Sequence, residues 1–142
     1  MIVYLDTSAL VKILIEEEGS EDAAVLWSEA DRIYSSRLAY LEARAALAAS
    51  LRTNRSNAPQ HNEAKAELER RWRQLSVVEM SSQVAGIAGE VAEDYGLRGY
   101  DAVHLASAFA SGGGNITLVT WDRDLAHAGL GSGLGVAPAP IP

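Results

Sequence analysis

Short apolar runs and longer amphipathic or alanine-rich stretches alternate along the whole chain. The two clearest apolar runs, 2–5 (Ile-Val-Tyr-Leu) and 116–120 (Ile-Thr-Leu-Val-Thr), are rich in β-branched residues and predict buried strands. Weaker runs predict further strands at 32–35, 77–78 and 134–136. Such alternation favours a mostly parallel sheet with helices on both of its faces.

Helices are predicted between these strands. The stretch 38–51 is rich in Ala and Leu, which favour helices, and 100–110 is apolar nearly all round, as in a buried helix. Ser20 is the predicted N-cap of a helix that runs to about residue 29, because acids follow in its first turn. The other predicted features are helices at 9–14, 60–74 and 84–95, a loop at 54–59 and a helical turn at 124–127.

The composition indicates one compact domain. The 142 residues are 48% hydrophobic and 22% charged, which is ordinary for a globular protein. We expect the domain to span 1–137 and a Pro-rich tail to occupy 138–142. No apolar run approaches the roughly 20 residues that span a bilayer, and the first residues do not resemble a secretory signal. The chain has no cysteine, which excludes disulfides and thiolate chemistry, and all of this fits the cytoplasm.

The charge of the chain is unevenly distributed. A formal net charge of −7 argues against binding of nucleic acid by bulk electrostatics. Half of the twelve basic residues nevertheless lie between Arg52 and Arg73. One interpretation is a solvated helix face with i,i+4 ion pairs. The other is an approach that binds the phosphates of a nucleic acid without reading bases, through Arg52, Arg55, Arg70 and Arg73.

Carboxylates occupy the positions where chemistry is expected. Asp6 follows the strand 2–5 and Asp122 follows the strand 116–120, and ligands of such sheets bind just outside the carboxyl ends of strands. Each is alternatively a helix cap, as is Asp101 at the start of the buried helix. Glu42 has only apolar neighbours at three and four residues along its helix, so it needs a compensating partner.

Clustered acids repel one another, and a divalent hard cation removes the conflict. Mg²⁺ and Mn²⁺ prefer carboxylate oxygens and retain several waters. His104 lies one turn after Asp101 and is a possible further ligand. Its apolar neighbours Val103 and Leu105 favour a packed histidine or one that supports a ligand instead.

These motifs resemble those of a known family. Residues 6–8 (Asp-Thr-Ser), Glu42, 98–106 (Arg-Gly-Tyr-Asp-Ala-Val-His-Leu-Ala) and 120–124 (Thr-Trp-Asp-Arg-Asp) are similar to the acidic motifs of PIN-domain ribonucleases. Length and single-domain form are most similar to VapC-type toxins of toxin–antitoxin pairs. The resemblance implies a three-layer α/β/α fold with a central, mostly parallel sheet. It also implies a metal-dependent endoribonuclease that hydrolyses RNA phosphodiester bonds with a metal-activated water.

The resemblance also assigns roles. It gives the catalytic and metal-binding acids as Asp6, Glu42, Asp101 and Asp122, with Mg²⁺ as the cofactor and Mn²⁺ as a possible substitute. Glu42 is expected to hold or orient the water. The supporting residues are Ser8 and Thr120, which orient a carboxylate, and Asp124, an acid found in part of the family.

Three partners follow from the same resemblance. They are an RNA substrate, a VapB-like antitoxin that places a basic side chain in the acidic cleft, and a second copy of the chain, for which the exposed apolar residues of 38–51 are the expected interface. The alternative function is a catalytically inactive PIN-like interaction module, which the four intact acids disfavour. A phosphatase of the haloacid dehalogenase type would also use a strand-end Asp, but it needs a second Asp two residues later. That position is Ser8, so this function is disfavoured.

Overall fold

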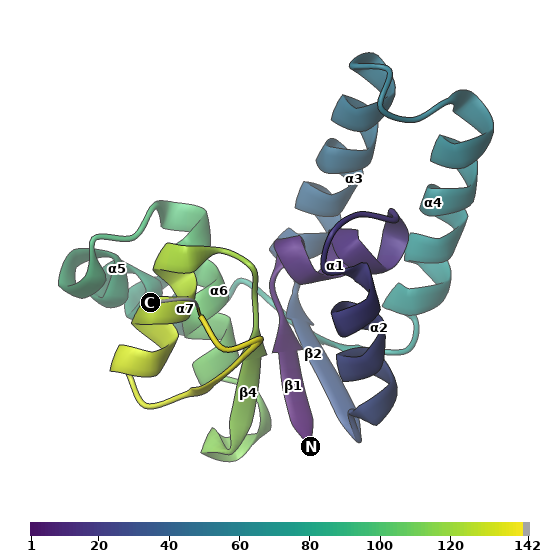
Figure 1. The fold of residues 1–142 in the computed structure, drawn as a ribbon. Helices are drawn as coiled ribbons and strands as arrows, with labels where there is room; N and C mark the ends of the chain where they lie inside the picture. The colour runs from purple at the N-terminus through teal and green to yellow at the C-terminus, as the bar shows by residue number, and fades with distance from the viewer. Residues whose placement is uncertain (141–142) are drawn as a thin grey trace.

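The computed structural model describes residues 1–140 and contains one five-stranded parallel sheet (Figure 1). The strand order is β3-β2-β1-β4-β5, and every pairing is parallel. The strands are β1 (Ile2–Leu5), β2 (Arg32–Ser36), β3 (Ser76–Val78), β4 (Ile116–Val119) and β5 (Gly135–Ala137). Both strands with the clearest sequence patterns lie side by side at the centre, where Leu5 is paired with Val119. The predicted parallel sheet is confirmed.

Helices cover both faces of the sheet, which gives the predicted three layers. The helices are α1 (Thr7–Leu14), α2 (Ser20–Glu29), α3 (Arg37–Arg52), α4 (Ala58–Trp72), α5 (Ser82–Tyr95), α6 (Gly99–Phe109) and α7 (Arg123–Gly131), with a 3₁₀ turn η1 (Gly112–Gly114). Alternate strand residues face opposite layers, as pleating requires. Tyr4 packs into the core that α5, α6 and α7 share, whereas Val3 and Leu5 pack against α1 and α2.

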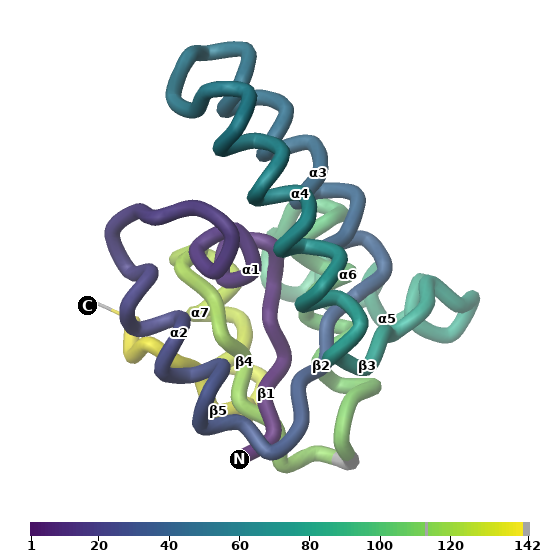
Figure 2. Tube along the Cα trace, turned by 90° about the vertical axis from the view of Figure 1, so that its right-hand side faces the viewer, coloured from purple at the N-terminus to yellow at the C-terminus, as the bar shows by residue number. Residues whose placement is uncertain are grey.

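Helices α3 and α4 form an antiparallel hairpin that projects beyond the body of the domain (Figures 1 and 2). Its base is anchored on α1 by the buried residues Leu10, Ala39, Ala43 and Leu68. Helix α4 begins at Ala58, two residues earlier than predicted, inside the segment expected to be a loop. The reason is a capping box between Asn57 and Gln60, with a proline in the first turn, where no N–H is needed.

Two further predicted boundaries need correction. Helix α2 is preceded by Gly19 in a left-handed conformation (φ 92°), whereas Ser20 is buried and is not the N-cap. The Ser20 hydroxyl instead accepts from the Glu17 N–H and donates to the Ile15 carbonyl, which fastens the turn before α2. Helix α7 extends to Gly131, well past the single turn predicted at 124–127, because its buried face continues through Ala128 and Gly129.

Residues 138–140 approach the carboxyl edge of the sheet. Of the predicted tail, residues 138–140 line a pocket together with Thr120 and Asp122, and 141–142 lie outside the described residues. None of the helices within 1–140 is long and apolar enough to cross a membrane.

Candidate active site

Asp6 is the most constrained acid of the carboxyl edge. It follows β1, is only 3% exposed, and its Oδ1 caps α1 by accepting from the Ala9 N–H at 3.0 Å. The Ser8 hydroxyl also donates to Oδ1, at 2.7 Å, and the Thr120 hydroxyl donates to Oδ2 at 2.6 Å. The two predicted roles of this residue, helix cap and site acid, are therefore compatible, because capping fixes the orientation of the carboxylate.

Thr120 connects Asp6 to the second strand-end acid, Asp122. Its hydroxyl donates to Asp6 and accepts from the Asp122 N–H at 3.0 Å. Asp122 caps α7 through a 2.9 Å bond from the Leu125 N–H. Ser8 makes a parallel link, since its hydroxyl accepts from the Trp121 N–H at 2.9 Å. The turns after β1 and β4 are thus joined by two hydroxyls, which are the contacts that the predicted supporting roles of Ser8 and Thr120 require.

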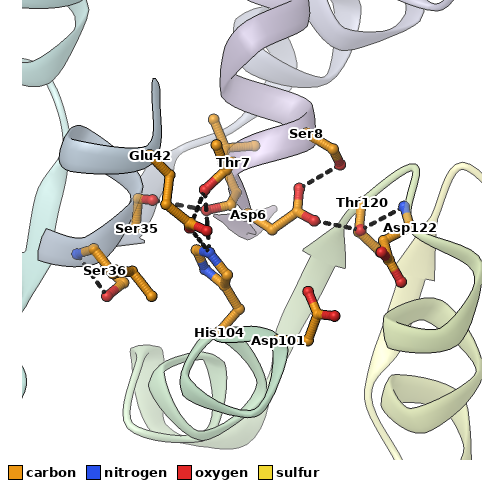
Figure 3. A network of polar contacts seen from close by, with 12 residues as sticks. Asp6, Thr7, Ser8, Ser35, Ser36, Glu42, Asp101, His104, Thr120 and Asp122 are labelled. Carbon is orange, nitrogen blue, oxygen red and sulfur yellow. Dashed lines mark hydrogen bonds and ion pairs between the residues drawn. The ribbon is translucent and has the colours of Figure 1, made fainter. Parts of the chain in front are cut away.

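Asp101 lies in the first turn of α6 and faces the same space as Asp6 and Asp122 (Figure 3). It is 6% exposed, and its Oδ2 lies 3.2 Å from the Arg98 Nη2. The same Arg98 nitrogen is 3.5 Å from the Asp122 Oδ2. Within residues 1–140, no other cationic side chain forms an ion pair with Asp101 or Asp122. Arg98 therefore lies between two of the predicted metal ligands, a contact that the sequence-based reasoning missed.

Glu42 reaches the site from α3 and is held by its own set of contacts. Its Oε1 accepts from the Thr7 hydroxyl at 2.5 Å and lies 2.8 Å from the His104 Nε2. The other ring nitrogen of His104 is 2.8 Å from the hydroxyl of Tyr4, which is fully buried. One assignment satisfies every group: Tyr4 donates to Nδ1, and the Nε2–H donates to Glu42. His104 therefore supports Glu42, as its apolar surroundings indicated.

The surroundings shift the pKa values of the site acids in different directions. Burial raises the pKa of Asp6, although three hydrogen bonds and His104 oppose the effect. Burial and then the neighbouring charge of Asp122 raise the pKa of Asp101, against Arg98. Burial also acts to raise the pKa of Glu42, but the bonds from His104 and Thr7 outweigh it, so that pKa is lowered. An anionic Glu42 thus lies next to aspartates that are costly to ionise.

The donor set fits a hard divalent cation, although it is not preassembled. Asp6, Asp101 and Asp122 come from β1, α6 and the β4–α7 turn, and all three offer carboxylate oxygens, the ligands that Mg²⁺ and Mn²⁺ prefer. Within residues 1–140, no group of three or more Asp, Glu or His side chains is already arranged to hold an ion. Formation of a metal site would require Arg98 to move away from Asp101 and Asp122.

The predicted RNA-binding arginines do not form one surface. Arg52 and Arg55 lie at the exposed tip of the α3–α4 hairpin, whereas Arg70 and Arg73 lie at the opposite end of α4, about 20 Å away along the helix. Arg70 forms ion pairs with Glu63 and Glu67, which agrees with the alternative of a solvated, ion-paired face. The four arginines therefore lie at two separate places on the hairpin, and their roles in RNA binding stay a prediction.

Asp124 lies exposed in the first turn of α7, two residues after Asp122, where the helix dipole also favours an acid. Its supporting role stays a prediction.

Fold and site together define a class of protein: a three-layer α/β domain with an acidic centre at the carboxyl edge of a parallel sheet. The model of the PIN domain matches residues 3–130. Ribonuclease VapC45 of Mycobacterium tuberculosis is 43% identical over 140 residues, which cover 99% of this chain and 97% of that protein. The chain belongs to the PIN-domain family.

Solved structures agree on the fold. FitAcB from Neisseria gonorrhoeae aligns with a TM-score of 0.70 at 22% identity, over 96% of both chains. A toxin–antitoxin complex from Klebsiella pneumoniae aligns with a TM-score of 0.62 at 15% identity, over 99% of this chain and 96% of that chain.

Proposed function

We propose that this protein is a metal-dependent endoribonuclease that hydrolyses RNA phosphodiester bonds and is the toxin of a toxin–antitoxin pair. The observation that carries the proposal is the convergence of Asp6, Asp101 and Asp122 from three separate segments at one edge of the sheet. Near full-length similarity to a protein named a ribonuclease supports RNA as the substrate. We place the activity in the cytoplasm, where such a substrate is available.

Asp6, Asp101 and Asp122 would hold Mg²⁺, or Mn²⁺ in its place. When bound, such an ion lowers the pKa of a coordinated water and offsets negative charge at the phosphate. The contribution of the protein is orientation: Ser8 and Thr120 hold both oxygens of the Asp6 carboxylate in place from opposite sides. A fixed carboxylate loses little conformational entropy when a ligand binds to it.

Glu42 would orient the attacking water. Its Oε1 is occupied by Thr7 and His104, and no described residue bonds Oε2. The lowered pKa of Glu42 keeps this group anionic near neutral pH, so Oε2 can accept a hydrogen bond from water. His104 acts here as a positioning residue, because it contacts Glu42 and is itself 2% exposed.

The proposed protein partners are an antitoxin and a second copy of the chain. Because the site is acidic, we expect the antitoxin to place a basic side chain in it. The fold similarity to a toxin–antitoxin complex supports such a partner. For the homodimer, Leu41 on α3 is 65% exposed and lies within the segment expected to form the interface.

A cleavage assay with a matched acid control tests the proposal. Purified protein should cut RNA with Mg²⁺ or Mn²⁺, lose this activity in EDTA and regain it when the metal is restored. Asp101→Asn should lower the rate at least about a hundredfold. Asp94→Asn, which changes an exposed acid on α5, should leave the rate nearly unchanged. Full activity of Asp101→Asn would refute the assignment, and RNA binding without cleavage would favour the inactive interaction module.

A further inference from the structure

Arg98 is positioned as a counter-ion inside the acidic site. Its Nε and Nη2 lie 3.3 and 3.2 Å from the Asp101 Oδ2, and Nη2 lies 3.5 Å from the Asp122 Oδ2. One guanidinium thus contacts both carboxylates, and its charge lowers the cost of ionising Asp101. These two carboxylates would also be needed by a divalent ion, so the arginine and the ion compete for the same oxygens.

The ion pair between Arg98 and Asp101 is weak enough for a metal ion to displace the arginine. The Arg98 side chain is 64% exposed, and exposed ion pairs are weak because water and salt screen them. Asp101, by contrast, is nearly buried and sits on the rigid first turn of α6. Movement of the guanidinium therefore costs little, whereas the acid stays in place.

Two local features indicate that the Arg98 side chain has a role other than stabilising α6. It is the N-cap residue of α6, but its side chain makes no capping hydrogen bond. Its guanidinium carbon lies 4.8 Å from the centre of the Tyr100 ring, and Tyr100 is 42% exposed. The ring offers a cation–π surface at the rim of the site, which keeps the displaced arginine close to where it started.

We propose that Arg98 is an internal competitor of the metal ion: it pairs with Asp101 and Asp122 in the metal-free protein, and a divalent ion must displace it, so Arg98 sets the metal affinity of the site. The inference rests on the proposed function and deepens it, because it assigns a regulatory element to the same site. A low affinity would make activity depend on the free metal concentration.

Isothermal titration calorimetry of the metal-free protein with Mn²⁺ tests this competition, because it measures metal affinity without an activity assay. Arg98→Gln should bind Mn²⁺ roughly two- to fivefold more tightly than wild type, because the competing pair is gone. Arg123→Gln is the matched control, since it removes the same charge from an exposed residue next to Asp122 that makes no ion pair with the site acids. It should change the affinity less than twofold.

Arg98→Lys distinguishes the effect of the positive charge from that of the guanidinium contacts with Asp101 and Asp122. It keeps the positive charge but lacks the planar fork, so its affinity should fall between those of wild type and Arg98→Gln. Equal effects of Arg98→Gln and Arg123→Gln would overturn the inference, as would weaker Mn²⁺ binding by Arg98→Gln. Absence of Mn²⁺ binding by all the variants and by wild type would instead contradict the proposed metal site itself. Far-ultraviolet circular dichroism of each variant verifies that the fold is intact.

Discussion

Replacement of Tyr4 by phenylalanine removes a single hydroxyl from the buried chain that runs through His104 to Glu42. The Tyr4 hydroxyl lies 2.8 Å from the His104 Nδ1, and both side chains are almost inaccessible to water. The phenyl ring preserves the packing of Tyr4 in the core, so the main loss is the hydrogen bond to His104. The Nδ1 lone pair is then left unsatisfied in a site too buried for water to replace the hydroxyl.

The expected cost is that of one orphaned buried acceptor, about 1–3 kcal/mol in the free energy of unfolding. Unfolding of a domain of this length has an entropy of about 0.3 kcal/mol per degree at the midpoint, so Tm should fall by about 3–10 °C. The change should also reach the site. Without the Tyr4 hydroxyl, only the Glu42 carboxylate still favours the proton on the His104 Nε2, so Glu42 is held less firmly and the cleavage rate should fall by up to about tenfold.

Thermal denaturation in EDTA and a cleavage assay at saturating metal measure the two effects separately. Tyr34→Phe is the matched control: it removes the same hydroxyl from the neighbouring strand β2, at a half-buried position outside the His104 network. It should change Tm by less than about 2 °C, which is the usual effect of a substitution away from such networks. If Tyr4→Phe is as stable and as active as Tyr34→Phe, the network has no role in positioning Glu42.

Three further predictions test other parts of the site. Burial raises the pKa of Asp6, so ionisation of this carboxyl group destabilises the metal-free fold. The stability of wild type relative to Asp6→Asn should therefore fall as pH rises from about 4 to 7. Urea titrations at several pH values measure this difference, and a constant difference would contradict the prediction. Thr120→Val breaks the link from Asp6 to the turn after β4 and should cost about 1–3 kcal/mol of stability and weaken Mn²⁺ binding, unlike the half-buried control Thr117→Val on β4. The double variant Arg52→Glu, Arg55→Glu should flatten the salt dependence of RNA binding by roughly 0.7 per lost phosphate contact, whereas an unchanged slope would mean that RNA enters by another face.

The sequence predicts the centre of this fold well because its central strands are unusually clear. Residues 2–5 and 116–120 are nearly continuous apolar runs, as strands buried on both faces must be. Their ends locate Asp6 and Asp122 at the carboxyl edge without any structure. Element ends are harder to predict: the Asn57 capping box and the extension of α7 to Gly131 depend on local hydrogen bonds and on tertiary packing.

The sequence does not reveal which distant segments contact one another. Tyr4 and His104 are separated by 100 residues, so neither one identifies the other as its partner. Arg98 was detectable in principle, because it precedes Asp101 by three residues, the spacing of a helical ion pair. The arginines between 52 and 73 mislead for the opposite reason. They are close in sequence, but the 15-residue helix α4 separates Arg52 and Arg55 at the tip of the hairpin from Arg70 and Arg73 at its base.

Sequencing of RNA 5′ ends after brief expression in a host that lacks this protein tests the central claim most directly, because it asks whether the acidic site cuts RNA in a cell. Wild type should create new ends at a small number of discrete positions. Asp101→Asn at equal expression should create none of them, and Asp94→Asn, on the exposed face of α5, should create the same set as wild type. Identical new ends in wild type and Asp101→Asn would show that the cleavage does not come from this site.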